Sequence, residues 1–266
     1  MNVEWVDSHC HLQERYRSTA QGEVAAVLER AAAASLVGLV CVGTDAESSL
    51  EAISLATDVA AGRFGDEVPV VRAVVGLHPH EATSGTGAIA EIIAAHRNLV
   101  AGVGECGLDY YYEHSPRAVQ LVAFAEQIRL AHEFDLPLVI HARDAWDDLF
   151  GVLRDEGVPT ETVLHCFTGG PAEATRCLEA GMTISFSGIT TFPKAPELRE
   201  AAALVPLASM LVETDSPFLT PVPHRGRPNE PSYVPLVGAV VADAAGTTVE
   251  ALAATTTANA RRIFGW

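Results

Sequence analysis

The stretch VDSHCHLQE, residues 6–14, places His9 and His11 two positions apart, directly after a short apolar run. Side chains two apart on a β-strand point to the same face, so both imidazoles can enter one cavity and share a metal ion. The pair alone does not separate a metal site from two ordinary histidines. Matching residues after the other strands would decide between them, and they would also define the fold.

Short β-branched runs alternate with longer, alanine-rich amphipathic stretches along the whole chain. Eight strand–helix units without a composition break predict one (β/α)8 TIM barrel over residues 1–266. A doubly wound open sheet also alternates in this way, but no G-x-G-x-x-G or P-loop motif follows any strand. We expect strands at 3–7, 36–42, 70–77, 100–104, 138–140, 163–164, 182–186 and 210–213. We expect helices near 24–34, 47–61, 88–97, 115–134, 145–156, 171–180 and 195–203, and a helix or helix pair at 232–264.

Composition limits the class of protein. The 266 residues are 48% hydrophobic, yet no window reaches the roughly 18 consecutive apolar residues that span a bilayer. The first residues, MNVEWVDSH, lack the basic and apolar regions of a signal peptide. Five scattered cysteines fit a reducing compartment better than a disulfide framework. We therefore expect a cytoplasmic protein without a membrane or an obligate protein partner.

The formal net charge is −17, from 17 Lys and Arg against 34 Asp and Glu. This balance argues against broad, nonspecific nucleic-acid binding through a basic surface. It does not exclude an enzyme that meets a phosphate at a metal centre.

Polar residues follow most of the expected strands, at the barrel end where active sites form. Six of the ten histidines lie there, which loose surface placement would not produce. The residues are His9 and His11, His78 and His80 in GLHPH, Glu105 and Asp109 in GECGLDY, His141 and Arg143 in IHAR, His165 in LHCF, and Glu213 and Asp215 in ETDSP.

Imidazoles with a few carboxylates suit zinc, manganese, iron or nickel. Two such ions would share a bridging ligand, which is a carbamylated lysine in some barrels. The one lysine, Lys194, lies in the helix-like PKAPELRE, so the bridge must be a carboxylate, and Glu105 is the best candidate. Strand alternation would turn Cys10, Cys106 and Cys166 away from the ligands, into packing positions.

Six motifs in order, VDSHCHL, GLHPH, GECGLDYY, IHAR, LHCFTG and ETDSPFLTPVPHRGRPNEP, resemble the TatD family of metal-dependent deoxyribonucleases, within the amidohydrolase-like barrels. The resemblance implies a barrel of the metal-dependent hydrolase type. It also implies that His9, His11, Glu105 and Asp215 surround one ion, and that Glu105, His141 and His165 surround a second. Asp215 would orient or deprotonate the attacking water.

We therefore predict a hydrolase of ester bonds, a deoxyribonuclease acting as an exonuclease on DNA. It would use two divalent ions (Mg, Mn or Zn), a metal-bridging hydroxide, and Asp215 and Glu105 as catalytic residues. His78 is expected to contact the phosphate, or else to pack. Arg143 is expected to bind substrate, or else to form a structural salt bridge. The tyrosines at 110–112 would offer stacking surfaces for bases, or would pack against the rim.

Two other functions fit parts of the pattern. The same two-metal site could hydrolyse a non-DNA ester or amide, such as a small molecule or an aminoacyl-tRNA, because fold and metal do not determine the substrate. The third hypothesis is a noncatalytic protein that keeps only a vestigial site. Such a protein would be expected to lose a ligand or the water-activating carboxylate first, and Asp215 and the other candidates are all present.

Overall fold

The computed structural model describes residues 3–17 and 21–266, and its strands form one eight-stranded sheet in the order β1 to β8. Every neighbouring pair is parallel. The strands are β1 (Trp5–Cys10), β2 (Leu36–Val42), β3 (Val70–Val75), β4 (Val100–Asp109), β5 (Leu138–Arg143), β6 (Val163–Leu164), β7 (Thr183–Phe186) and β8 (Met210–Val212).

The two edges of the sheet meet just past the end of β8. The Asp215 backbone N–H donates to the His9 carbonyl at 2.9 Å, and the His11 N–H donates to the Ser216 carbonyl at 2.8 Å. A parallel bridge joins Cys10 to Ser216 at the same place. The predicted barrel fold is therefore confirmed, and its closure holds Asp215 against the two histidines of β1.

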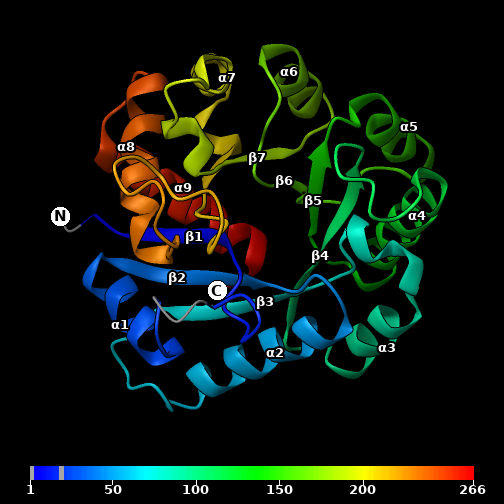
Figure 1. Cartoon of the computed structure of the whole chain (residues 1–266), viewed down its shortest axis with the longest axis horizontal. Helices are drawn as coiled ribbons and strands as arrows, with labels where there is room; N and C mark the ends of the chain where they lie inside the picture. The colour runs from blue at the N-terminus through cyan, green and yellow to red at the C-terminus, as the bar shows by residue number, and fades with distance from the viewer. Residues whose placement is uncertain (1–2, 18–20) are drawn as a thin grey trace.

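Helices alternate with the strands and surround them, as Figure 1 shows. The expected helices are present with bounds that shift by a few residues, and the segment 232–264 is a helix pair. The helices are α1 (Val24–Ala33), α2 (Ala46–Ala60), α3 (Gly87–Ala95), α4 (Arg117–Phe134), α5 (Trp146–Glu156), α6 (Pro171–Glu179), α7 (Pro196–Leu204), α8 (Val234–Ala244) and α9 (Val249–Phe264), with short 3-10 helices at η1 (Pro79–Ser84), η2 (Gly188–Thr191), η3 (Leu207–Ser209) and η4 (Pro231–Tyr233).

Each strand divides its side chains between two cores, because successive residues face opposite sides of a sheet. In β5, Leu138 and Ile140 pack in the layer between sheet and helices, whereas Val139 packs inside the barrel. His141 and Arg143 continue the inward face and line a pocket at the other end of the strand. The inner face of β5 is therefore apolar near the start of the strand and polar at its end.

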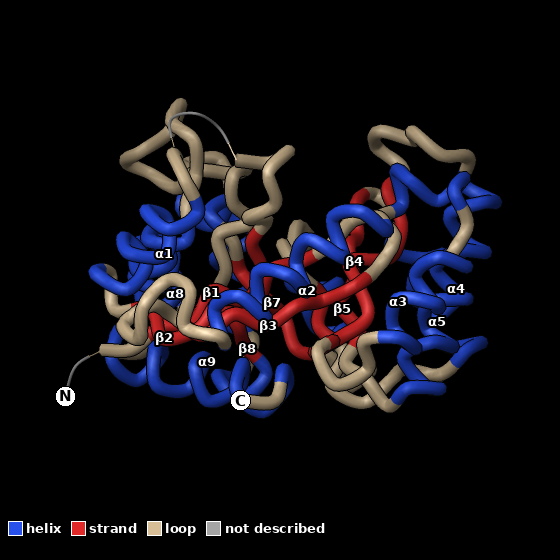
Figure 2. Tube along the Cα trace, turned by 90° about the horizontal axis from the view of Figure 1, so that it is seen from below, coloured by secondary structure: helices blue, strands red, loops and turns tan. Residues whose placement is uncertain are grey.

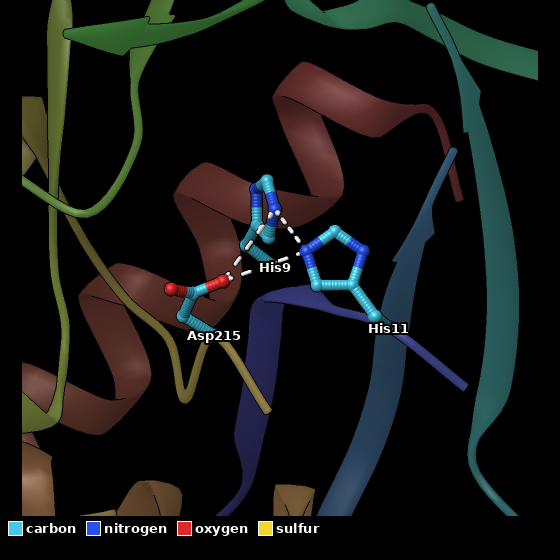
Figure 3. Close-up of side chains that lie close together, drawn as sticks. All are labelled: His9, His11 and Asp215. Carbon is cyan, nitrogen blue, oxygen red and sulfur yellow. Dashed lines mark hydrogen bonds and ion pairs between the residues drawn. The ribbon is translucent and has the colours of Figure 1, made fainter. Parts of the chain in front are cut away.

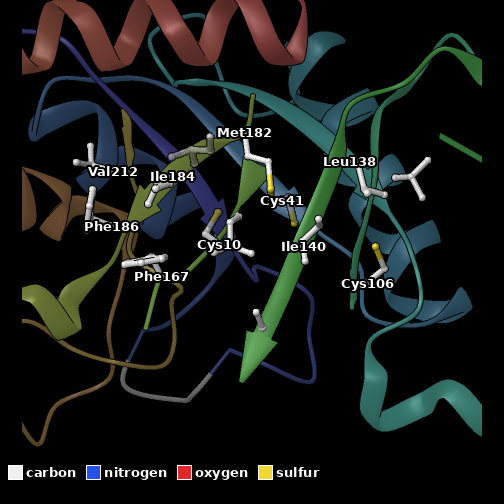
Figure 4. Packing of buried hydrophobic residues seen from close by; sticks show 14 of the residues in the cluster. Cys10, Cys41, Cys106, Leu138, Ile140, Phe167, Met182, Ile184, Phe186 and Val212 are labelled. Atoms are coloured by element: carbon white, nitrogen blue, oxygen red, sulfur yellow. The ribbon is translucent and has the colours of Figure 1, made fainter. Parts of the chain in front are cut away.

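The cysteines belong mainly to the layer between sheet and helices. Cys10, Cys41 and Cys106 lie there among leucine, isoleucine and phenylalanine side chains (Figure 4). Cys177 lies in the same cluster. The packing role predicted for Cys10 and Cys106 is confirmed.

Helix α9 closes one end of the barrel. Its Ala260, Ile263 and Phe264 pack against valines and leucines on the inner faces of the strands. Figure 2 shows α9 on the opposite side of the strands from the long connecting loops. The pocket lined by the strand-end histidines opens on the loop side.

Three strands extend further than expected, because β1 continues to Cys10, β4 to Asp109 and β5 to Arg143. β4 and β5 stay paired to Asp109 and Arg143, beyond the apolar residues that mark each strand in the sequence. Backbone hydrogen bonds continue the ladder whatever the side chains are, so Glu105, Asp109 and His141 lie within strands rather than after them.

Among the described residues, no single helix has the length and apolar character of a membrane span. The segments Pro231–Ala244 and Val249–Phe264 pass that test only together, as a pair bent by 112°.

Candidate metal centre

Three side chains converge where β8 meets β1. The Nε2 atoms of His9 and His11 lie 3.3 Å apart. Asp215 Oδ1 lies 3.5 Å from His11 Nε2 and 4.0 Å from His9 Nε2, and Figure 3 shows the three groups facing one another. All three residues are buried, and one nitrogen or oxygen of each is close enough to hold a common ion.

A buried carboxyl holds this junction in place. Asp7 accepts hydrogen bonds from the Thr214 N–H at 2.9 Å, the Thr214 hydroxyl at 2.5 Å and the His9 N–H at 3.2 Å. It thereby ties β1 to the segment that follows β8. Asp215, one residue further on, adopts a φ of +55°, which turns its side chain toward the histidine pair.

Glu105 lies between this group and the remaining histidines. Its Oε2 is 2.7 Å from His9 Nε2 and 3.2 Å from His165 Nε2, and its Oε1 is 3.1 Å from His78 Nε2. Burial by itself would raise the pKa of Glu105, but His165 and a hydrogen bond with His9 outweigh it and hold that pKa well below its ordinary value. Glu105 is therefore an ionised carboxylate surrounded by imidazoles.

His141 and His165 present one nitrogen each to the same space. His141 Nδ1 and His165 Nε2 lie 3.4 Å apart. On the far side of each ring, the His141 Nε2–H donates to Asp109 at 3.2 Å, and the His165 Nδ1–H donates to Glu213 at 3.3 Å. In the neutral form of each ring the proton therefore faces the carboxylate, and the lone pair of the other nitrogen faces the centre.

The donor set fits divalent cations. His11 Nδ1–H donates to the Val42 carbonyl at 2.9 Å, which leaves the lone pair of Nε2 toward Asp215. With both rings neutral and their protons on the carboxylates, His141 Nδ1 and His165 Nε2 would face each other as lone pairs and could not hydrogen-bond to each other. A cation between such atoms would satisfy both, and imidazole with carboxylate is a donor set that zinc and manganese accept.

Asp109 and Glu213 orient these imidazoles, a role that the sequence did not reveal. Burial would raise the pKa of Asp109, but hydrogen bonds from His141 and His80 hold it well below its ordinary value. Burial lowers the pKa of His165, but Glu105 and Glu213 outweigh it and raise the pKa to about 9. In ETDSP, Glu213 lies two residues before Asp215, and this spacing was the available signal.

His78 differs from the other imidazoles of the site. Its Nδ1 accepts a hydrogen bond from the His80 N–H at 3.1 Å, so the ring carries its proton on Nε2. Burial lowers its pKa well below the ordinary value, which keeps the ring neutral. His78, Glu105 and His141 are close enough to form a further ligand group, but the tautomer makes His78 Nε2 a donor toward the pocket.

Arg143 lies at the mouth of the same pocket. Its guanidinium lies 4.3 Å from the ring centre of Tyr111 and 5.0 Å from that of Tyr112. Among the described residues, none forms an ion pair with Arg143, so the structural salt bridge considered as an alternative is absent. The pocket has a volume of about 380 Å³ and also contains Glu105, Asp215 and Cys166.

Cys166 departs from the packing position expected for it. β6 ends at Leu164, and Cys166 adopts a φ of +43°. The strand alternation therefore no longer applies at this residue. Its side chain is half-buried, lines the pocket and lies 3.3 Å from the Ser187 hydroxyl.

Comparisons with known proteins agree with this geometry. The family model described as TatD related DNase matches residues 6–265. The metal-dependent hydrolase YabD of Bacillus subtilis is 37% identical over 97% of this chain and 98% of its own. The 3'-5' ssDNA/RNA exonuclease TatD of Erwinia amylovora is 37% identical over 90% of this chain and 92% of its own.

The fold is similar to solved structures as well. The crystal structure of YJJV, a TatD homolog from Escherichia coli, superposes with a TM-score of 0.89 and 28% identity over 99% of both chains. The strand order, the ligand-like cluster and these matches agree along almost the whole sequence. The chain therefore belongs to the TatD family of metal-dependent hydrolases.

Proposed function

We propose that this hydrolase cleaves phosphodiester bonds at the ends of DNA strands, using two divalent cations. His9, His11, Asp215 and Glu105 would hold one cation, and Glu105, His141 and His165 the other. The observation that carries the proposal is the set of imidazole nitrogens that gather around one ionised carboxylate, Glu105. A similar protein named as an exonuclease supports the substrate class.

When bound, such cations activate water and neutralise the charge that develops on a phosphate. The protein's own residues supply the remaining steps. Asp215 has one oxygen against the histidine pair and lies at the pocket, in a position to accept the proton of the attacking water. Glu105 holds the two ligand groups at a common centre.

Two donors would hold the phosphate. The neutral His78 has its Nε2–H 3.1 Å from Glu105 Oε1, and it would turn this N–H from Glu105 to a non-bridging oxygen of the phosphate. Arg143 has N–H groups without a carboxylate partner among the described residues, and its planar guanidinium suits bidentate binding of a phosphate. Both side chains line the pocket that contains Glu105 and Asp215.

The acidic composition is compatible with this substrate. Two divalent cations carry more charge than the two ligand carboxylates Glu105 and Asp215, so the centre attracts a phosphate despite a net charge of −17. We expect weak DNA affinity that depends on the cations rather than on a basic groove. If chelator-treated protein bound DNA as tightly as the metal-loaded protein, this picture would be wrong.

Metal analysis combined with a nuclease assay tests the function. Protein stripped with chelator and reloaded separately with Mg²⁺, Mn²⁺ or Zn²⁺ is given an end-labelled oligonucleotide. We expect about two ions per chain, as in two-metal hydrolases, and stepwise shortening that chelator abolishes. Because the ligand set is rich in histidine, we expect Mn²⁺ or Zn²⁺ to bind more tightly than Mg²⁺. Shortening that continues without metal would contradict the proposal.

The net charge of −17 favours a second candidate, hydrolysis of a non-DNA ester or amide at the same centre. The metal-loaded protein can be compared on DNA ends, an aminoacyl-tRNA and a panel of small esters and amides. Turnover of one of these without turnover of DNA would favour this candidate.

We also infer that residues 1–266 act as one barrel domain in the cytoplasm. Support for the compartment comes from the cysteines, all five of which are free thiols although most are buried. Cell fractionation with an antibody against the chain would test the location.

A further inference from the structure

The aromatic side chains that the protein exposes gather around one pocket. Among the described residues, three aromatic side chains have about half or more of their surface exposed. They are Tyr111 (59%), Tyr112 (51%) and Phe218 (49%). Tyr112 and Phe218 line the pocket of the metal centre, and Tyr111 contacts Tyr112 at 4.8 Å between ring centres. Large apolar groups left in water beside a site usually mark contacts with a ligand.

The two lining rings come from different elements and border the centre on different sides. Tyr112, after β4, lies 5.6 Å from the His80 ring and stacks on His114 at 5.7 Å. Phe218, after β8, lies 6.1 Å from both the His11 and the Tyr16 rings. One aromatic wall therefore adjoins the Asp109 side of the centre, and the other adjoins the Asp215 side.

Both rings have firmly held backbones, and about half of each side chain is exposed. The Tyr112 N–H donates to Asp109 at 2.9 Å. The Phe218 N–H donates to the Asp215 carbonyl at 2.9 Å, and the buried Asn229 donates to the Phe218 carbonyl at 2.6 Å. One wall is thus tied to the Asp109 carboxylate and the other to the Asp215 main chain, so the backbones of both rings are fixed relative to the centre.

The chemistry between the walls suits a nucleobase. Arg143 lies over Tyr111 and Tyr112, so a cation for phosphate adjoins a flat apolar surface for a base. Among the described residues that line the pocket there is no Asn or Gln, the amide side chains that read adenine. Recognition by stacking alone accepts every base but requires one that is not covered by neighbours in a duplex.

We propose that Tyr112 and Phe218 form a nucleobase subsite that stacks the unpaired bases at the end of a single strand. The inference rests on the proposed phosphodiester hydrolysis and adds which side chains bind the bases of its substrate. If these rings instead bound a partner protein, the partner would compete with the oligonucleotide. Removing bases from the oligonucleotide would then leave its cleavage unchanged.

The test compares a normal oligonucleotide with one whose last two nucleotides at each end are abasic. The metal-loaded wild type should cleave the abasic strand with a kcat/KM roughly 5- to 150-fold lower, as expected when a base stacked on an aromatic ring is lost. Tyr112→Ala and Phe218→Ala should shrink this ratio toward one, mainly through KM. Tyr112→Phe and Phe218→Tyr keep a ring and should retain the ratio.

A spectroscopic measurement separates stacking from catalysis. In an Asp215→Asn background, a strand with terminal 2-aminopurine should lose fluorescence on binding, and adding Tyr112→Ala should reverse most of that loss. Leu204→Ala, at an equally exposed apolar residue on α7, is the matched control and should change neither readout.

The outcomes distinguish the two levels of the proposal. Equal kcat/KM on normal and abasic strands in the wild type would overturn the subsite and leave the hydrolysis standing, as would an unchanged ratio in both alanine variants. No cleavage of either strand by any metal-loaded form would overturn the proposed function, and this inference with it.

Discussion

The two ends of the barrel are built from the same strands but carry different kinds of inward side chain. At the end closed by α9, inner faces present valine and leucine to Ile263 and Phe264. Two residues further along, the same faces present candidate metal ligands or the carboxylates that contact them. The pairs are Val139 with His141, Val163 with His165, and Leu211 with Glu213.

The apolar residues that stabilise the fold and the polar residues of the candidate metal centre therefore lie at opposite ends of the barrel. The apolar end removes hydrocarbon from water, which stabilises the fold. The polar end buries Asp7, and burial outweighs its hydrogen bonds from Thr214 and raises its pKa to about 8, which shows a desolvation cost at this end. Substitutions at the two ends should therefore have opposite effects on activity and on unfolding.

The largest effect is expected at the polar end, for Asp215→Asn. The amide keeps the shape but cannot accept the proton of the attacking water. We expect kcat on an oligonucleotide to fall by about 10²- to 10⁴-fold, the usual contribution of a general base. The free energy of unfolding should stay within about 1 kcal/mol. Asp66→Asn, on an exposed loop, is the control, and full activity in Asp215→Asn would show that the base is another group.

The reverse effect is expected at the apolar end, for Phe264→Ala. Phe264 is 3% exposed and fills the barrel end, so its loss leaves a cavity. We expect about 3–5 kcal/mol less stability in urea unfolding, with kcat per folded molecule unchanged. The exposed Leu204→Ala should cost no more than about 0.5 kcal/mol. A fall in kcat that parallels the stability would show that the two ends are not independent.

A smaller effect should distinguish orientation from ligation, through Glu213→Gln. The amide oxygen can still accept from His165 Nδ1–H, but the negative charge behind that ring is lost. We expect metal affinity, measured by competition with a chelator, to weaken by about 10- to 100-fold. Stability should be unchanged or higher, because a buried charge with one unpartnered oxygen is removed. Equal metal affinity in Glu213→Gln and in its exposed counterpart Glu200→Gln would exclude this role.

The smallest effect is expected at the rim, for Arg143→Lys. The ammonium keeps the charge but loses the planar contact with Tyr111 and Tyr112. A cation–π contact at an exposed site is worth about 0.5–1 kcal/mol, so KM for DNA should rise roughly two- to fivefold with kcat nearly unchanged. Arg63→Lys, far from the pocket, is the control. A fall in kcat without a change in KM would assign Arg143 to the chemistry instead.

Much of the fold could be predicted from the sequence because its signals are local. The strand at 36–42 and the one at 163–164 match β2 and β6 in full, since each is a short apolar run between helices. The ends of β4 and β5 could not be predicted, because glycine, glutamate and histidine residues continue a backbone ladder without an apolar pattern. Cys166 was misplaced for a related reason: alternation stops where a two-residue strand ends.

The candidate site, too, could be predicted from the sequence only in part. That His9 and His11 share a face, and that His141 and Arg143 do, follows from the period of a strand and was available from the sequence. The sequence also selected Glu105 as the shared carboxylate. It gave no means of assigning Asp109 and Glu213, since an acidic residue near a strand end looks the same whether it binds an ion or orients an imidazole.

The sequence by itself therefore determined which side chains reach the barrel mouth. Only the tertiary structure decided what each atom does there. Glu213 bonds to His165 across 48 residues of chain and Asp109 to His141 across 32, and these bonds determine which ring nitrogen keeps its proton. The physical reason is that strand alternation acts between neighbours, whereas a histidine tautomer depends on the atom that barrel closure brings to the far side of the ring.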